Sequence, residues 1–86
     1  MPDVTLVLYS RAGCHLCEEM KAVVEPVARQ LRCELQDVDI AGQAELESRF
    51  GLEIPVLCIN GRKAFKYRVT ETELRQRLGR EMRQRS

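Results

Sequence analysis

Two cysteines placed three residues apart are the side chains of this 86-residue chain best suited to chemistry. Cys14 and Cys17 follow an apolar run and open a stretch whose apolar residues recur at helical spacing. Both thiols then lie on one helical turn, where they can form a small disulfide. Cys14 comes first, at the helix N-terminus, where free N–H groups and the helix dipole favour a thiolate. Because the thiolate is the form that attacks a disulfide, the pair predicts redox chemistry.

The residues beside the pair are suited to support a thiolate. Arg11 precedes Cys14 by three residues, and His15, the only histidine of the chain, follows it directly. Positive charge on either side chain would favour an ionised Cys14. His15 can equally be an exposed helix residue with a small effect. Leu16 is expected to anchor the start of the helix or to contact an apolar substrate.

Metal binding is the chemical alternative for two cysteines at this spacing. Structural zinc takes four ligands, and no second pair of cysteines is spaced like Cys14 and Cys17. Cys33 and Cys58, the remaining cysteines, fall on predicted strands away from the motif. We therefore predict no metal ligands, and we expect both to be small core residues, with Cys33 partly exposed.

The first half of the chain predicts the elements that carry the pair. Residues 4–9 are almost continuously apolar and predict a strand buried on both faces. The helix opened by the motif should continue to about residue 31, with a kink at Pro26; the alternative is a stop near Val24 and a restart. Residues 33–39 predict a second strand. A short helix over 43–50 should end at Gly51 in the left-handed conformation.

The second half predicts a hairpin and a final helix. Residues 54–59 predict a third strand, and Asn60-Gly61 is a strong signal for a two-residue turn into a fourth strand over 63–69. Thr70 and Glu73 are spaced as a capping box at the start of a helix over 71–83. The order predicts an α/β fold with a four-stranded mixed sheet and three helices. The strands within the early strand–helix–strand units should be parallel to each other, and the hairpin should add an antiparallel strand at the edge of the sheet.

Length and composition place limits on the class of protein. Eighty-six residues with 44% hydrophobic residues suffice for one small domain, and no apolar run is long enough to cross a membrane. No signal-peptide pattern is present, so we expect a cytoplasmic protein whose cysteines are thiols, ligands or transient catalytic disulfides. A secreted protein with two structural disulfides is the alternative.

The net charge of +1 conceals an acidic excess in residues 1–61 and a basic excess in residues 62–86. The basic end is expected to be a solvated helix face, and attraction of an acidic partner is the functional alternative. With 5% aromatic residues and no recognisable motif, nucleic-acid binding is not expected.

The order of elements, with the cysteine pair after the first strand, resembles the thioredoxin-like pattern in its short glutaredoxin form. The chain is most similar to glutaredoxin-like small proteins that carry Cys-His-Leu-Cys and a later Ile-Pro-Val-Leu. The segments that carry the resemblance are residues 8–18, Val38-Asp39, residues 50–57 and Asn60-Gly61. It covers about residues 4–80, and we expect residues 1–86 to form a single domain of this type.

The resemblance implies a thiol–disulfide oxidoreductase that exchanges electrons with protein disulfides. Cys14 would be the nucleophile and Cys17 the resolving thiol. Pro55 would be a cis-proline facing the pair, and the free backbone of Ile54 would accept an extended substrate strand. The implied substrate-binding residues are Arg11, His15, Leu16, Ile54 and Pro55. We expect no bound cofactor. The electron source should be glutathione or a thioredoxin-type reductase, and the substrate should be a disulfide-containing protein or a small thiol. We also expect a monomer.

The sequence differs from typical glutaredoxins in ways that bear on the substrate. The motif is Cys-His-Leu-Cys instead of Cys-Pro-Tyr-Cys, and residues 62–68 lack the Gly-Gly-Asp segment that binds glutathione. Two alternatives stay open: a redox-sensitive protein-binding module with little turnover, and a glutathione-dependent glutaredoxin. Tyr9 either lines the substrate groove or packs in the core. The basic residues after the hairpin protect an edge strand or dock a partner; they are Arg62, Lys63, Lys66 and Arg68.

Overall fold

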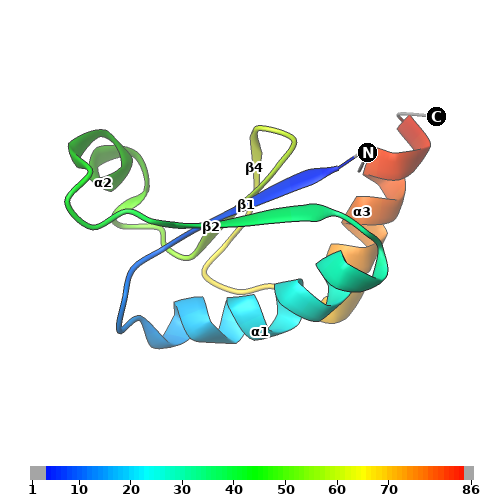
Figure 1. The fold of residues 1–86 in the computed structure, drawn as a ribbon, viewed down its shortest axis with the longest axis horizontal. Coiled ribbons are helices and arrows are strands. Elements are labelled where there is room, and N and C mark those ends of the chain that lie inside the picture. The colour runs from blue at the N-terminus through cyan, green and yellow to red at the C-terminus, as the bar shows by residue number, and fades with distance from the viewer. Residues whose placement is uncertain (1–3, 85–86) are drawn as a thin grey trace.

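Strands and helices alternate in the predicted order through residues 4–84, the part of the chain that the computed structural model describes (Figure 1). This confirms the thioredoxin-like order of elements and the mixed sheet. The elements are β1 (Thr5–Ser10), α1 (His15–Gln30), β2 (Glu34–Asp39), α2 (Ala44–Phe50), β3 (Val56–Ile59), β4 (Arg62–Lys66) and α3 (Glu71–Gln84).

The four strands form one sheet in the order β2-β1-β3-β4. β1 and β2 are parallel, whereas β3 is antiparallel to β1 and β4 is antiparallel to β3. The expectation of a second parallel strand–helix–strand unit was therefore wrong. A parallel β3 would need a connection running back along the sheet, about 20 Å for a six-residue strand. The connection, residues 40–55, does not run back in this way: it holds the seven-residue α2 and returns the chain at the end of the sheet where β2 stops.

The two faces of the sheet are covered unequally. On one face, α1 and α3 bury Leu6 and Leu8 of β1 completely; in Figure 1 α1 lies below the sheet and α3 rises along its right-hand end. On the other face, a smaller cluster around Phe50 leaves Val7 and Tyr9 only partly buried. β1 is thus fully buried on one face and not on both, because α2 is too short to cover the second.

The helix that carries the cysteine pair is continuous. α1 runs through Pro26 without ending, so the alternative of a stop near Val24 was wrong. Pro26 cannot donate to the carbonyl of Ala22, but both residues are exposed, and water can satisfy that carbonyl.

Interactions between neighbouring residues form the hairpin turn and the start of α3. Asn60 and Gly61 have φ of 51° and 84°, which confirms the two-residue hairpin turn. The capping box of α3 is also confirmed: the amide of Glu73 donates to Thr70 Oγ1 at 3.1 Å, and the amide of Thr70 donates to Glu73 Oε1 at 3.0 Å.

Two predicted ends were wrong. β4 stops at Lys66 instead of residue 69, because Tyr67 leaves the strand conformation with φ of 69°. Gly51 is right-handed, with φ of −55° and ψ of −31°. A Cβ at Gly51 would lie 2.5 Å from the carbonyl oxygen of Glu47, so this glycine allows a close backbone approach and not a left-handed turn.

Candidate active site

Cys14 occupies the N-cap position of α1 and is joined to Cys17 by a disulfide. The two Cα atoms are 5.2 Å apart, and the amide of Cys17 donates a hydrogen bond to Cys14 Sγ at 3.2 Å. Cys14 is half-buried, whereas Cys17 is only 4% exposed. Cys14 is therefore the more accessible cysteine of the pair.

The helix N-terminus supplies the polar groups nearest to Cys14. Its carbonyl accepts the amide of Glu18 at 3.1 Å, which starts the helical hydrogen-bond ladder. The amide that reaches Cys14 Sγ is one of the donors that a helix leaves free in its first turn. A negative sulfur at this position is stabilised by that donor and by the helix dipole.

His15 lies beside the pair but pairs with another side chain. Its imidazole Nε2 is 3.2 Å from Glu19 Oε2, one helical turn away, and its side chain is 90% exposed. The charge that a protonated His15 would carry is thus partly neutralised by Glu19. Leu16 is half-buried, in agreement with a role at the start of the helix.

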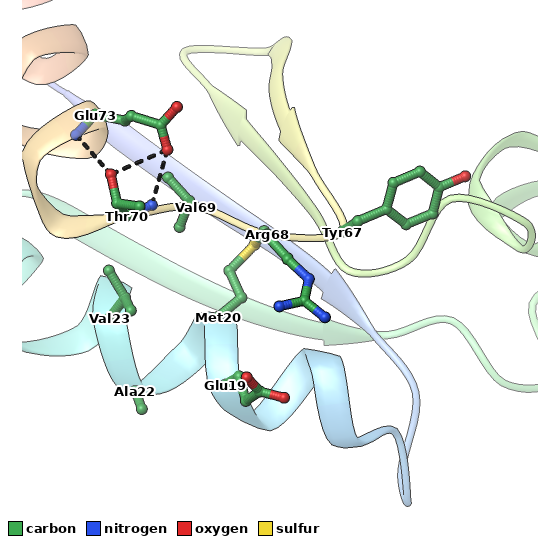
Figure 2. A pocket seen from close by; sticks show the side chains of 9 residues that line it. All are labelled: Glu19, Met20, Ala22, Val23, Tyr67, Arg68, Val69, Thr70 and Glu73. Atoms are coloured by element: carbon green, nitrogen blue, oxygen red, sulfur yellow. Dashed lines mark hydrogen bonds between the residues drawn. The ribbon is translucent and has the colours of Figure 1, made fainter.

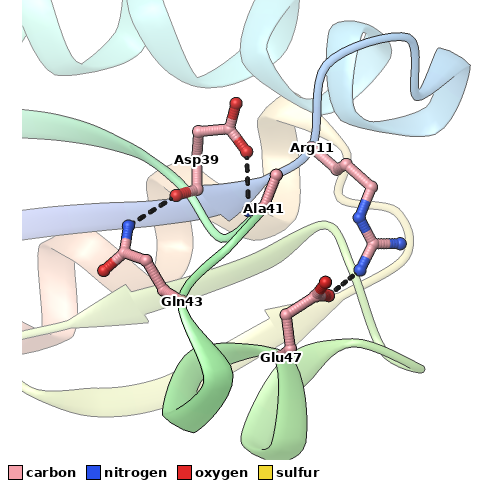
Figure 3. Close-up of polar contacts among 5 residues, drawn as sticks. All are labelled: Arg11, Asp39, Ala41, Gln43 and Glu47. Atoms are coloured by element: carbon pink, nitrogen blue, oxygen red, sulfur yellow. Dashed lines mark hydrogen bonds and ion pairs between the residues drawn. The ribbon is translucent and has the colours of Figure 1, made fainter.

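Arg11 makes contacts on both sides of the loop before the cysteine pair. Figure 3 shows its guanidinium paired with the carboxylate of Glu47 on α2, while its backbone carbonyl accepts the amide of Cys14 at 3.2 Å. α2 itself is oriented by Asp39, which accepts the amide of Ala41 and the side-chain amide of Gln43. Arg11 therefore ties the loop before the cysteine pair to α2, a contact that the sequence spacing did not predict.

The Ile54–Pro55 peptide bond is cis, as the family resemblance implied. Tyr9 on β1 pairs with Val56 on β3, so Pro55 lies beside the end of β1 from which the loop to Cys14 departs. Pro55 is buried and Ile54 is half-buried. Within residues 4–84 the backbone N–H and C=O of Ile54 make no hydrogen bond, so both are free to pair with another chain.

A polar pocket of about 210 Å³ borders the buried cysteine on another side. Across it, Lys21 pairs with Asp37 at 2.9 Å, and Ser10 Oγ donates to the same carboxylate at 3.0 Å. The hydrogen bond and charge of Asp37 raise the pKa of Lys21. The sequence does not predict these contacts, because the three residues come from separate elements, β1, α1 and β2. The lining residues are Ser10, Arg11, Ala12, Cys17, Glu18, Lys21, Asp37 and Asp39.

The other two cysteines lie away from the pair. Cys58 is 7% exposed in the small cluster with Phe50 and Val56, as predicted, and Cys33 is half-buried against the larger core. Burial raises the pKa of both thiols.

Residues 4–84 contain no group of three or more His, Cys, Asp or Glu placed to hold a metal ion. Within the same range no helix is long and apolar enough to cross a membrane.

Tyr9 and the basic residues of the hairpin have structural contacts. Tyr9 stacks on Phe50 with ring centroids 4.4 Å apart, so it packs in the core. Lys63 and Lys66 pair with Glu53 on the segment before the cis-proline. Arg62 and Arg68 are exposed.

Comparison with known proteins agrees with this arrangement. Residues 5–79 match the family model described as Glutaredoxin-like domain (DUF836). The uncharacterized protein Rv0508 of Mycobacterium tuberculosis is 32% identical over 79 residues, which cover 86% of this chain and 79% of that protein. The glutaredoxin-like protein YDR286C homolog of Dictyostelium discoideum is 25% identical over 78 residues, covering 84% of this chain and 72% of that protein.

Solved structures show the same fold. Protein XcR50 from X. campestris is 36% identical with a TM-score of 0.70, covering 87% of this chain and 96% of that one. Protein Ne2328 from Nitrosomonas europaea is 29% identical with a TM-score of 0.74, covering 90% of this chain and 92% of that one. Thioredoxin from Halobacterium salinarum, at 23% identity and a TM-score of 0.68, shares the fold. With a thioredoxin-like fold, a close cysteine pair and a family match over most of its length, this chain belongs to the glutaredoxin-like (DUF836) family.

Proposed function

We propose that this protein is a thiol–disulfide oxidoreductase that exchanges electrons with protein disulfides through Cys14 and Cys17. The observation that carries the proposal is the placement of Cys14. It caps α1, it receives the amide of Cys17, and it forms a disulfide with a cysteine that is itself buried. This arrangement provides one thiol for attack and a second for resolution.

The reaction has two exchange steps. In the reduced protein, the Cys14 thiolate attacks one sulfur of the substrate disulfide, and the other substrate sulfur leaves with the bonding electron pair and takes up a proton. Cys17 then loses its proton to solvent and attacks Cys14 Sγ. The Cys14–Cys17 bond forms, the bond between Cys14 and the substrate breaks, and the second substrate sulfur leaves as a thiolate. Two electrons have moved from the cysteine pair to the substrate.

The groups around the pair suit an extended protein segment. The free backbone groups of Ile54 can pair with it in the manner of an added strand, beside the cis-proline. Leu16 and His15 lie on the first turn of α1 and are available for side-chain contacts. The guanidinium of Arg11 is paired with Glu47, so only the solvent-exposed atoms of this side chain are available to contact a substrate.

The proposal includes an electron source and a cellular setting. We propose a thioredoxin-type reductase or glutathione as the reductant, no bound cofactor, and a monomer working in the reducing cytoplasm. The absent Gly-Gly-Asp segment supports protein disulfides over glutathione as the substrate. In its place Tyr67 and Arg68 follow β4.

The test is reduction of insulin disulfides with dithiothreitol as electron source. We expect the protein to accelerate the reaction and Cys14→Ser to abolish the acceleration, because the attacking thiolate is lost. Cys33→Ser is the matched control and should retain activity, since Cys33 lies away from the pair. Undiminished activity of Cys14→Ser would contradict the proposal.

A second experiment separates the proposal from its alternatives. Cys17→Ser should accumulate mixed disulfides with many protein clients, because the resolving thiol is absent. A redox-sensitive binding module should retain one partner without a covalent link. A robust glutathione-coupled rate with hydroxyethyl disulfide would instead favour a glutathione-dependent activity.

A further inference from the structure

One tyrosine makes two hydrogen bonds to the loop that leads into the cis-proline, residues 51–55. The amide of Tyr67 donates to the carbonyl of Pro55 at 2.8 Å, and the Tyr67 hydroxyl donates to the carbonyl of Leu52 at 3.1 Å. Figure 2 shows the Tyr67 side chain leaving the end of β4 and pointing towards the segment between α2 and β3. One residue therefore fixes this loop at two points that are three residues apart.

Tyr67 adopts an uncommon backbone conformation to do this. Its φ of 69° lies in the left-handed region, which side chains larger than glycine seldom occupy outside turns. Such conformations persist where the surrounding contacts demand them, and they occur often at ligand-binding segments. Here the conformation ends β4 and turns both the amide and the ring of Tyr67 towards the cis-proline loop.

The loop held in this way exposes a large apolar side chain. Leu52 is 94% exposed and Tyr67 is 42% exposed, and among residues 4–84 they are the exposed large hydrophobic residues. A single exposed leucine is ordinary, but these two are joined by a hydrogen bond and lie next to Ile54. Their burial against a partner would remove apolar surface from water at the point where the free backbone of Ile54 is available.

Charged contacts hold the same loop from the side of β4. Glu53 pairs with Lys63 and Lys66, and Lys66 Nζ lies 5.6 Å from the centre of the Tyr67 ring. Glu53 and Pro55, the neighbours of Ile54, thus attach the loop to the hairpin. The side chains of Leu52 and Ile54 take part in none of these contacts. This leaves the Leu52 side chain free for a partner, whereas that of Ile54 packs partly against the small cluster around Phe50.

We propose that Tyr67 is a positioning residue for protein substrates: it holds the cis-proline loop so that Leu52 contacts an apolar side chain next to the client's disulfide. This rests on the proposed function and names its substrate class, an extended protein segment with a large apolar residue near the cysteine. The client backbone pairs with Ile54, and its apolar side chain lies on Leu52 and on the ring of Tyr67. A small disulfide has no such segment and gains nothing from this contact.

The experiment compares two oxidants of the pre-reduced protein, insulin and hydroxyethyl disulfide. The thiols that remain at timed intervals are alkylated and counted by mass spectrometry. Varying the insulin concentration separates the half-saturating concentration from the limiting rate. The variants are Tyr67→Phe, which loses the hydroxyl bond to Leu52, Leu52→Ser, which loses the apolar side chain, and Leu52→Met, which keeps apolar character.

We expect Leu52→Ser and Tyr67→Phe to raise the half-saturating insulin concentration by roughly 5- to 10-fold, the size expected for losing one apolar contact in the first variant and one hydrogen bond in the second. The limiting rate and the rate with hydroxyethyl disulfide should stay within about two-fold of wild type, since Cys14 is untouched. Leu52→Met should behave like wild type. Circular dichroism verifies that each variant is folded.

The outcomes distinguish this inference from the proposed function. Unchanged insulin kinetics in both variants, with an active wild type, would overturn the inference alone. An equal loss with both oxidants would also overturn it, because the effect would then reach the cysteine pair. A wild-type protein that is oxidised by neither disulfide would overturn the proposed function, and the inference with it.

Discussion

The four cysteines differ in burial and in their place in the fold. Cys14 caps a helix and is half-buried, Cys17 lies one turn further in and is almost completely buried, and the other two pack in the two cores. Burial raises the pKa of Cys33 and Cys58, which lowers the fraction of reactive thiolate. The same residue type is thus available for exchange in one place and protected from it in others.

This difference predicts the order of alkylation in the oxidised protein. With iodoacetamide at pH 8, Cys33 and Cys58 should both react more slowly than free cysteine, and Cys58 should be the slower because it is less exposed. Peptide mapping by mass spectrometry measures both rates, and the urea-unfolded protein provides the control in which the two rates become similar. Native Cys58 reacting as fast as free cysteine would contradict its burial.

Among the secondary-structure elements, the β3–β4 hairpin contacts the cis-proline loop and holds it in place. Glu53 belongs to the loop, while its partners Lys63 and Lys66 belong to β4. The hydrogen bond from Lys63, with the positive charges of Lys63 and Lys66, lowers the pKa of the Glu53 carboxyl from its ordinary value of 4.5. A lowered pKa in the folded state means that the ionised carboxyl stabilises the fold above pH 4.5. That contribution is lost as the pH falls through the lowered value.

We therefore predict that Glu53→Gln destabilises the protein in a pH-dependent way. The difference in free energy of unfolding between wild type and Glu53→Gln should be constant near pH 7. It should disappear as the pH falls below 4.5 and through the lowered pKa. Urea denaturation across this range measures it. Glu45→Gln is the control, since Glu45 has no ion pair within residues 4–84, and a pH-independent difference for Glu53→Gln would contradict the prediction.

Considered as a whole molecule, the protein has one large core and one small one on opposite faces of its sheet. The large core joins α1 and α3 to β1 and β3, whereas the small core rests on α2. The loop to Cys14 and the cis-proline lie where β1 and β3 meet at one end of the sheet. Stability therefore comes mainly from one face, while the pairing of the central strands positions the site.

This division predicts unequal costs for neighbouring substitutions in β1. Leu8→Ala should lower the free energy of unfolding by about 2–5 kcal/mol, because Leu8 is completely buried in the large core. Val7→Ala should cost roughly 1 kcal/mol, because Val7 is half-buried on the other face and loses less apolar contact. Urea denaturation of both variants measures the two costs. Equal costs would show that the two faces contribute alike.

Features that depend on neighbouring residues could be predicted from the amino-acid sequence. The pair at the start of α1, the turn at Asn60 and the capping box at Thr70 follow from interactions within a few residues, and all were predicted. The order of helices and strands follows in the same way from the spacing of apolar residues. The cis bond before Pro55 came from the family resemblance, since no local pattern specifies it.

Contacts between segments far apart in the chain became visible only in the folded protein. The fold reversed β3 relative to β1, paired Arg11 with Glu47, and placed Lys21 and Asp37 beside Cys17. It also placed Tyr67 against the loop before the cis-proline, in a backbone conformation that its residue type does not favour. Each of these depends on how the chain packs, and packing energy is gained only when distant segments meet. The cysteine pair could therefore be found from the sequence, whereas the surface that surrounds it needed the fold.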